Sequence, residues 1–259
     1  MVRILLTFIA SLFAAAPAWA DWELNMPVGV TDISADTYDL HMLVLWICTI
    51  IGALVFGTMI YAMVKFRKSK GAVAAKFDHS TTAEMVWTTI PVLILVAMAI
   101  PAAQVAVRIE DDRDSEMTIK ITGYQWKWHY EYVGEGVEFF SNLAATSNAA
   151  RQIGSQTDPF AVDNYLLEVD RRLVVPVGVK VRYLITSNDV LHAWWVPDLA
   201  VKRDAVPGYF NSGWFQINEP GTYRGQCAEL CGKDHGFMPV VVEALSREEF
   251  SQWLQEQSI

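Results

Sequence analysis

The chain has 259 residues, of which 53% are hydrophobic and 19% charged, and its formal net charge is −9. A composition this apolar excludes an intrinsically disordered protein and indicates membrane-spanning segments. The acidic balance argues against a nucleic-acid-binding protein, which needs a basic surface, and three cysteines are too few for a scaffold held by several disulfides.

The first 20 residues have the pattern of a secretory signal peptide. Arg3 supplies a basic start, an uncharged and mostly apolar stretch covers residues 4–16, and Ala18-Trp19-Ala20 fits a small-x-small cleavage site. The apolar stretch is shorter than the roughly 20 residues that a membrane span needs. The sequence therefore predicts a signal peptide over residues 1–20, with Asp21 as the new N-terminus. An uncleaved anchor helix is the alternative.

Two longer apolar runs predict a transmembrane hairpin. Residues 42–64 and residues 85–107 each form 23 positions without a charged side chain, which is long enough to cross the hydrocarbon core of a bilayer. Pro91 and Pro101 in the second run are tolerated more easily in membrane helices than in soluble ones. Buried helices of a soluble protein are the alternative, but two such runs in succession favour the membrane.

The charges around this hairpin predict its orientation. The connecting loop, residues 65–84, has a basic excess that places it in the cytoplasm. The N-terminal segment 21–41 and the domain 109–259 then lie outside. Residues 109–259 carry 13 basic and 22 acidic side chains, so the whole net charge falls on the external domain. Such a charge attracts a basic partner, or simply keeps an external surface soluble.

Short β-like runs separated by turn residues predict an all-β sandwich or barrel for the external domain. Residues 134–163 are polar and are predicted to form a long surface loop. Ser246 and Glu249 form a capping box, which predicts a helix at the end of the chain. The predicted strands cover residues 117–122, 124–132, 165–169, 180–187, 213–217 and 239–243.

The run 124–132 is unusual because aromatic residues occupy every second position. A regular strand places alternate side chains on one face, so this run predicts a row of five aromatic rings. A packed core or a subunit contact explains most of them. The five residues are Tyr124, Trp126, Trp128, Tyr130 and Tyr132.

The strongest functional signal is a cluster of metal-binding residue types near the end of the domain. Cys227 and Cys231 are four positions apart, His235 follows four positions later and Met238 three after that. Upstream, His192 lies in an apolar, strand-like stretch that can bring it to the same end of the sandwich. Three ordinary interpretations compete: a disulfide between the cysteines, a Cys₂His₂ zinc site, or a simple core histidine at position 192.

Each ordinary interpretation leaves residues unexplained. A disulfide leaves His235 and Met238 without a role, and zinc leaves Met238, because a thioether is a soft ligand that suits copper. Five donors fit two copper ions that are bridged by both sulfurs and capped by one histidine each. Met238 is then a weak axial ligand of one copper, and a backbone carbonyl serves the other. An electron shared over two ions suits electron transfer better than bond-making chemistry.

On these residues the chain resembles subunit II of the haem–copper cytochrome c oxidases, in the bacterial form with a dinuclear copper centre called CuA. The hairpin, the aromatic run, the histidine strand and the copper loop follow in the family's order. The resemblance implies a cupredoxin-like Greek-key β domain after the two-helix hairpin. It also implies the copper ligands His192, Cys227, Cys231, His235, Met238 and the backbone carbonyl of Glu229.

The same resemblance implies roles for further residues. The Glu229 side chain binds Mg²⁺ or Mn²⁺ at the interface with subunit I, although a solvated carboxylate is the alternative. Trp126, the first tryptophan of Gln-Trp-x-Trp, receives electrons from cytochrome c. Glu84, in Glu-x-x-Trp, lies at the mouth of a proton channel into subunit I, or simply favours the start of its helix. Glu131, Asp170 and Asp189 match carboxylates that dock cytochrome c, whereas Asn188 replaces an acid present in several relatives.

The implied function is that of subunit II in a proton-pumping cytochrome c oxidase, with subunits I and III as partners. The complex lies in the bacterial inner membrane, and the C-terminal domain of this chain faces the periplasm. Haem belongs to subunit I, where oxygen is reduced to water. A membrane-tethered copper-binding or copper-delivery module is the alternative. Quinol oxidase subunits of the same fold lack the copper ligands, and nitrous oxide reductases share the copper loop but are soluble.

Overall fold

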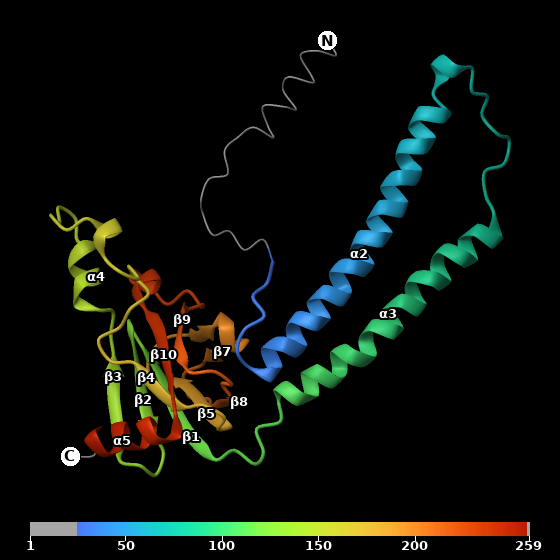
Figure 1. The fold of residues 1–259 in the computed structure, drawn as a ribbon. Coiled ribbons are helices and arrows are strands. Elements are labelled where there is room, and N and C mark those ends of the chain that lie inside the picture. Colours follow the sequence, from blue (N-terminus) through green and yellow to red (C-terminus); the bar gives the residue numbers. More distant parts are fainter. Residues whose placement is uncertain (1–24, 258–259) are drawn as a thin grey trace.

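The structure is a computed structural model that describes residues 25–257, and the predicted signal peptide lies outside these residues. Two long helices extend from one side of a β domain (Figure 1). The first, α2, covers Asp32–Lys65, and the second, α3, covers Thr81–Ile109. A loop with a short 3₁₀ helix, η1 (Lys68–Lys70), joins them at the end of the hairpin farthest from the β domain.

Local sequence explains where the two helices begin. Thr31 caps α2 in a reciprocal arrangement with Ser34, and the Ser80 side chain accepts a hydrogen bond from the backbone N–H of Ala83 at the start of α3. Within residues 25–257, these are the two helices that are long and apolar enough to cross a membrane. Each helix is longer at both ends than the uncharged stretch that it contains, which is 42–64 in α2 and 85–107 in α3.

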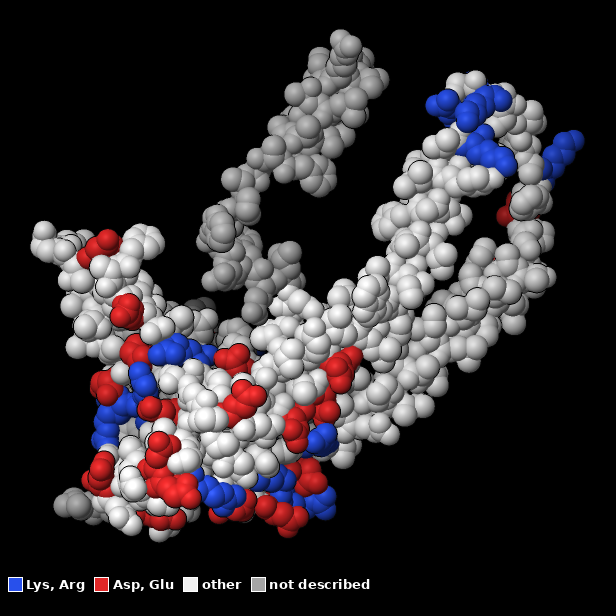
Figure 2. Space-filling model, viewed as in Figure 1, with Lys and Arg blue, Asp and Glu red and all other residues white. Residues whose placement is uncertain are grey.

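The faces of both helices are open along their length. Large apolar side chains such as Trp46, Leu54 and Leu93 are at least 60% exposed, which is costly in water and favourable in lipid or against another apolar helix. Figure 2 shows basic side chains gathered at the far end of the hairpin, and acidic ones at its foot and over the β domain. This charge distribution matches the positive-inside pattern on which the predicted orientation depends.

The foot of the hairpin is fixed to the β domain by hydrogen bonds and ion pairs from both helices. The Trp214 indole N–H donates to the backbone carbonyl of Arg108 at 3.1 Å, and the Asn218 amide donates to Asp32 at 2.8 Å. Arg203 pairs with Glu110 at 2.7 Å, just after α3 ends. Arg108 also pairs with Asp36 across the two helices.

The β domain consists of two five-stranded sheets that pack face to face, which confirms the predicted sandwich. The first sheet has the order β3-β2-β1-β5-β8 and the second β4-β10-β9-β6-β7. Most pairs are antiparallel, but β1 with β5 and β4 with β10 are parallel. The strands are β1 (Met117–Tyr124), β2 (Lys127–Tyr132), β3 (Val137–Ser141), β4 (Leu173–Pro176), β5 (Val181–Ser187), β6 (His192–Val196), β7 (Val201–Ala205), β8 (Asn211–Phe215), β9 (Gly221–Cys227) and β10 (Pro239–Leu245).

The core between the sheets contains aromatic and branched side chains from both inner faces. Trp128, Tyr130 and Trp194 are fully buried, and the indole N–H of Trp194 donates to the Tyr130 hydroxyl at 3.2 Å. The predicted C-terminal helix is also present. This helix, α5 (Arg247–Gln257), begins with the Ser246–Glu249 capping box and packs Phe250 against Tyr132.

The prediction of one regular strand over residues 124–132 is wrong. The chain turns at Gln125 and Trp126, so that β1 and β2 form an antiparallel hairpin in which Tyr124 pairs with Lys127. Burial alternates along β2, and it places Trp128, Tyr130 and Tyr132 in the core. Trp126 lies in the turn instead, because a reversal of direction breaks the two-residue period.

The region between β2 and β4 also differs from its prediction. Residues 134–163 were expected to form a loop, but they contain β3, the helix α4 (Ala145–Ala150) and the 3₁₀ helix η2 (Pro159–Ala161). Val137, Phe139 and Ser141 of β3 point inward although the surrounding sequence is polar. Conversely, the strand predicted over residues 165–169 consists of turns, with a single bridge from Val169 to Leu143.

Candidate metal centre

The order of the strands brings the predicted metal-binding residues to one end of the sandwich. His192 begins β6 and Cys227 ends β9, and these strands are antiparallel neighbours in which Trp194 pairs with Cys227. Met238 directly precedes β10, and its carbonyl accepts a hydrogen bond from the Cys227 N–H at 2.9 Å. The loop between β9 and β10 contains Cys231 and His235, and it includes the 3₁₀ helix η4 (His235–Phe237).

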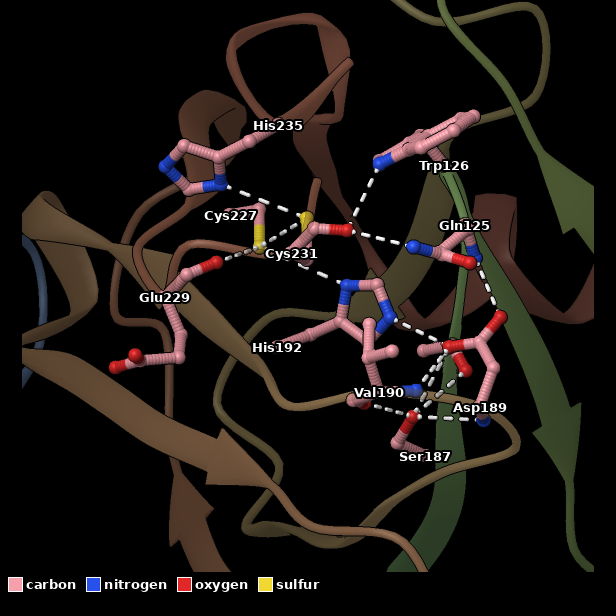
Figure 3. Close-up of polar contacts among 11 residues, drawn as sticks. Gln125, Trp126, Ser187, Asp189, Val190, His192, Cys227, Glu229, Cys231 and His235 are labelled. Atoms are coloured by element: carbon pink, nitrogen blue, oxygen red, sulfur yellow. Dashed lines mark hydrogen bonds and ion pairs between the residues drawn. The ribbon is translucent and has the colours of Figure 1, made fainter. Parts of the chain in front are cut away.

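The two sulfurs lie between the two imidazoles (Figure 3). The Sγ atoms of Cys227 and Cys231 are 3.8 Å apart, and both cysteines are free thiols. The Nδ1 atom of His192 lies 3.9 Å from the Cys227 sulfur, and that of His235 lies 3.5 Å from the Cys231 sulfur on the other side. The donor atoms of His192, Cys227 and Cys231 all lie within 4.8 Å of one another.

This arrangement separates the interpretations that the sequence left open. A disulfide requires a sulfur–sulfur distance of about 2.05 Å, far shorter than the distance here. A single tetrahedral zinc ion requires all four donors around one point, about 2.0–2.3 Å from the metal. The imidazoles instead face the sulfur pair from opposite sides. Such a donor set suits two soft ions that share both sulfurs, with one histidine for each ion.

Electrostatics at the sulfur pair favour a bound cation. Burial opposes ionisation of the Cys227 thiol, but hydrogen bonds from His192 and from backbone groups outweigh it and lower its pKa to about 7. Burial, together with the charge of a Cys227 thiolate, raises the pKa of Cys231 to about 12. Two adjacent thiolates therefore repel each other, and a cation that contacts both can hold both in the ionised form.

A carboxylate on the preceding loop orients His192. The Asp189 side chain accepts a hydrogen bond from Nε2 of His192 at 2.9 Å and another from the backbone N–H of Gln125 at 2.7 Å. Burial lowers the pKa of His192, but Cys227 and Asp189 outweigh that effect and raise it above the ordinary value. With Nε2 engaged, Nδ1 is the nitrogen that points toward the sulfurs, as in metal sites where a carboxylate fixes the histidine tautomer.

The turn between β1 and β2 covers the sulfur pair from the other sheet. The indole N–H of Trp126 donates to the backbone carbonyl of Cys231 at 3.1 Å, and the Gln125 side-chain amide donates to the same oxygen at 2.9 Å. Trp126 is partly exposed, and the ammonium of Lys233 lies 5.5 Å from the centre of its ring. One tryptophan therefore contacts both solvent and the backbone of the cysteine loop.

The structure places the remaining predicted site residues as follows. Met238 is 1% exposed beneath the loop. The Glu229 carbonyl lies 3.4 Å from the Cys227 sulfur, whereas its exposed carboxylate points away from the sulfurs in Figure 3. Glu84 lies in the first turn of α3, at the opposite end of the hairpin from the metal centre.

The three carboxylates matched to cytochrome c docking each have a partner within the chain. Glu131 pairs with Lys120 at 2.9 Å, and Asp170 accepts two hydrogen bonds from Asn142. Asp189 accepts a hydrogen bond from His192.

The contact between Asp189 and His192 was not predicted from the sequence. The spacing Asp-x-x-His was visible in the sequence, but the same spacing is common where the two side chains never meet. Gln125 begins the Gln-Trp-x-Trp motif, but nothing in that motif indicated that its amide donates to the Cys231 carbonyl.

Comparison with known proteins agrees with this architecture. The family model described as "Cytochrome C oxidase subunit II, periplasmic domain" matches residues 117–245, and the one described as "Cytochrome C oxidase subunit II, transmembrane domain" matches residues 19–105. The two matched regions together span the helical hairpin and the β domain, including every residue of the metal centre.

Individual relatives extend over almost the whole chain. A probable cytochrome c oxidase subunit 2 of Rickettsia bellii is 37% identical, with 96% of this chain and 89% of the relative covered. Cytochrome c oxidase subunit 2 of Arabidopsis thaliana is 35% identical, with 99% and 97% covered. Among solved structures, the periplasmic domain of subunit II of the Bradyrhizobium japonicum cytochrome oxidase is 39% identical, with 56% of this chain and 94% of that chain covered and a TM-score of 0.47.

Proposed function

We propose, from the premise that this chain belongs to the cytochrome c oxidase subunit II family, that its β domain holds two copper ions and receives electrons from cytochrome c. The chain is a subunit of the haem–copper oxidase complex. Membership leaves open which residues perform the electron transfer, and the geometry of the metal centre supports a specific assignment. The observation that carries it is the pair of sulfurs flanked by one imidazole on each side.

In this proposal Cys227, Cys231, His192 and His235 would together hold the two coppers. The buried Met238 thioether and the Glu229 carbonyl are the weak ligands. When bound, the copper pair supplies a site that takes up and passes on one electron at a time, toward the haem and copper of subunit I, where oxygen is reduced to water. Asp189 keeps Nδ1 of His192 directed at the sulfurs, and the closed end of the sandwich excludes water from them.

Trp126 is proposed as the first acceptor of electrons from cytochrome c. Trp126 is partly exposed and donates a hydrogen bond to the Cys231 carbonyl, so it connects the surface to the cysteine loop. The acidic surface of the β domain, visible in Figure 2, supports docking of a basic cytochrome through long-range attraction.

The remaining assignments concern the membrane and the partner subunits. We assign the apolar helix faces to lipid and to subunits I and III, the loop 65–84 to the cytoplasm, and the β domain to the periplasm of a bacterial inner membrane. The exposed Glu229 carboxylate is available to hold Mg²⁺ or Mn²⁺ at the interface with subunit I. Glu84, at the cytoplasmic end of α3, is assigned to the mouth of the proton channel of a proton-pumping complex.

Electron paramagnetic resonance of the full-length chain tests the copper assignment. We expect two coppers per chain and a seven-line spectrum, because one unpaired electron shared by two equivalent copper nuclei gives that pattern. A four-line spectrum from one copper would point instead to a membrane-tethered copper-delivery module. Tightly bound zinc would contradict any assignment to electron transfer.

A second experiment tests the role of Trp126 in the intact oxidase. Trp126→Phe keeps an aromatic ring but removes the hydrogen bond to the Cys231 carbonyl, so we expect slower reduction by cytochrome c and an unchanged copper spectrum. Reduction of Trp126→Phe at the wild-type rate would exclude Trp126 as the acceptor.

The salt dependence of turnover tests the docking of cytochrome c on the acidic surface. Turnover should fall as salt rises, because the Debye length shrinks from about 10 Å at 0.1 M to about 3 Å at 1 M. Salt-independent turnover would exclude acidic docking.

A further inference from the structure

The polar segment between β3 and β4 is closed at its base and held against the β domain. The backbone N–H and side-chain amide of Asn142 donate to the Asp170 carboxylate at 2.7 and 2.9 Å, and the Asp170 N–H donates back to the Asn142 carbonyl at 3.0 Å. Inside this closure the buried Ser147 hydroxyl accepts a hydrogen bond from the Leu166 N–H at 3.1 Å. The short helix α4 is therefore fixed in position although it lies in a polar stretch of sequence.

One side chain of this segment reaches the loop of the metal centre. Arg151 directly follows α4, and its guanidinium lies 3.3 Å from the Asp234 carboxylate and 4.3 Å from the centre of the Phe237 ring. Its Nε donates to the Asn148 side chain at 2.8 Å, which holds the guanidinium in that direction. The side chains of Arg151 and Asp234 are each only 22% exposed, so water screens this pair less than a surface pair.

The two contacts of Arg151 bracket His235. Asp234 directly precedes His235, and Phe237 is the last residue of the same 3₁₀ turn. Within the turn, the Phe237 N–H donates to the Asp234 carbonyl at 2.9 Å. His192 has its imidazole fixed by Asp189, whereas His235 takes its position from this turn. A cation that contacts both ends of the turn restricts the movement of the imidazole between them.

We propose that Arg151 is a positioning residue for His235 and that the Arg151–Asp234 pair sets the charge balance at this end of the copper site. The inference rests on the proposed function, because it requires copper to be bound at His235. It adds a residue from a segment outside the copper loop and the strands that border it.

The sign of the expected effect follows from electrostatics. Oxidation adds positive charge to the site, so a nearby unpaired carboxylate favours the oxidised form and an unpaired guanidinium favours the reduced form. Arg151→Gln leaves Asp234 unpaired and should lower the reduction potential. Asp234→Asn leaves Arg151 unpaired and should raise it. Arg151→Lys keeps the charge and should restore the potential.

The experiment measures the reduction potential and the rate of copper release to a chelator in the copper-loaded full-length chain. Arg171→Gln is the matched control. The Arg171 guanidinium also lies over an aromatic ring, 4.2 Å from the centre of Phe139, and it donates to the Gln257 side chain at 2.7 Å. Neither partner belongs to the copper loop. We expect opposite potential shifts for the two single variants, about five-fold faster copper release from Arg151→Gln because a charge pair and a cation–π contact are lost, and no change for Arg171→Gln.

Other outcomes overturn the inference. Unchanged potentials, shifts of the same sign in Arg151→Gln and Asp234→Asn, or an equal effect of Arg171→Gln would each show that Arg151 acts only on general stability. If Arg151→Gln folds but does not load copper while Arg151→Lys does, the positioning role is supported directly. A wild-type chain without dinuclear copper fails the proposed function itself, before any variant is compared.

Discussion

Replacement of Cys227 by serine is expected to remove the seven-line copper spectrum completely. The Cys227 sulfur lies 3.8 Å from the Cys231 sulfur and 3.9 Å from Nδ1 of His192, so it is the atom that connects one imidazole to the other sulfur. A serine hydroxyl is a hard ligand that does not ionise near neutral pH and cannot bridge two soft ions. The measurement is electron paramagnetic resonance, with copper content, on the full-length chain.

Cys48 provides the matched control for this prediction. It is a free, exposed thiol within α2, and this helix extends away from the β domain that contains the sulfur pair (Figure 1). Cys48→Ser makes the same chemical change and should leave both the copper content and the spectrum as in the wild type. A shared-electron spectrum in Cys227→Ser would mean that the bridging sulfurs have been assigned wrongly.

Gly123→Ala is expected to displace His192 and weaken copper binding. Gly123 lies near the end of β1, where an added Cβ atom would sit 2.8 Å from Cδ2 and 3.0 Å from Cγ of the His192 ring. The ring is also hydrogen-bonded to Asp189 and is fully buried, so a displacement of the ring strains that hydrogen bond. Loss of such an orienting contact typically costs roughly 10–100-fold in metal affinity, which competition with a copper chelator measures.

Gly236 serves as the control for Gly123. It lies within the copper loop, beside His235, but an added Cβ atom there has nothing within 4 Å. Gly236→Ala should therefore bind copper as the wild type does, apart from a small change in loop entropy. Equal affinities for Gly123→Ala and the wild type would show that the His192 ring has more freedom than its contacts indicate.

Local patterns in the sequence were sufficient to predict the elements that depend on neighbouring residues. The helices around the uncharged runs 42–64 and 85–107, the capped C-terminal helix and the sandwich class all follow from composition, periodicity and turn signals. The loop from Cys227 to Met238 could be predicted as a candidate metal site, because two thiols, an imidazole and a thioether at this spacing are soft or borderline donors.

The parts that could not be predicted depend on contacts between distant residues. The aromatic period of residues 124–132 continues through the turn at Gln125 and Trp126, so the alternation gave no sign that the chain reverses there. The strand β3 lies in a polar stretch, and it forms because β2 offers an open edge that its five residues can pair with. The pairing of Arg151 with Asp234 joins residues 83 positions apart, a distance over which spacing carries no information.

The bonds that fix the foot of the hairpin to the β domain have a mechanical consequence. A carrier that swings on a flexible tether alternates between its donor and its acceptor, and its rate depends on how fast it travels. Here Trp214, Asn218 and Arg203 hold the domain to both helix ends, so in the proposed electron transfer the domain acts as a stationary relay. Its throughput is then governed by fixed separations, and only the soluble donor has to diffuse.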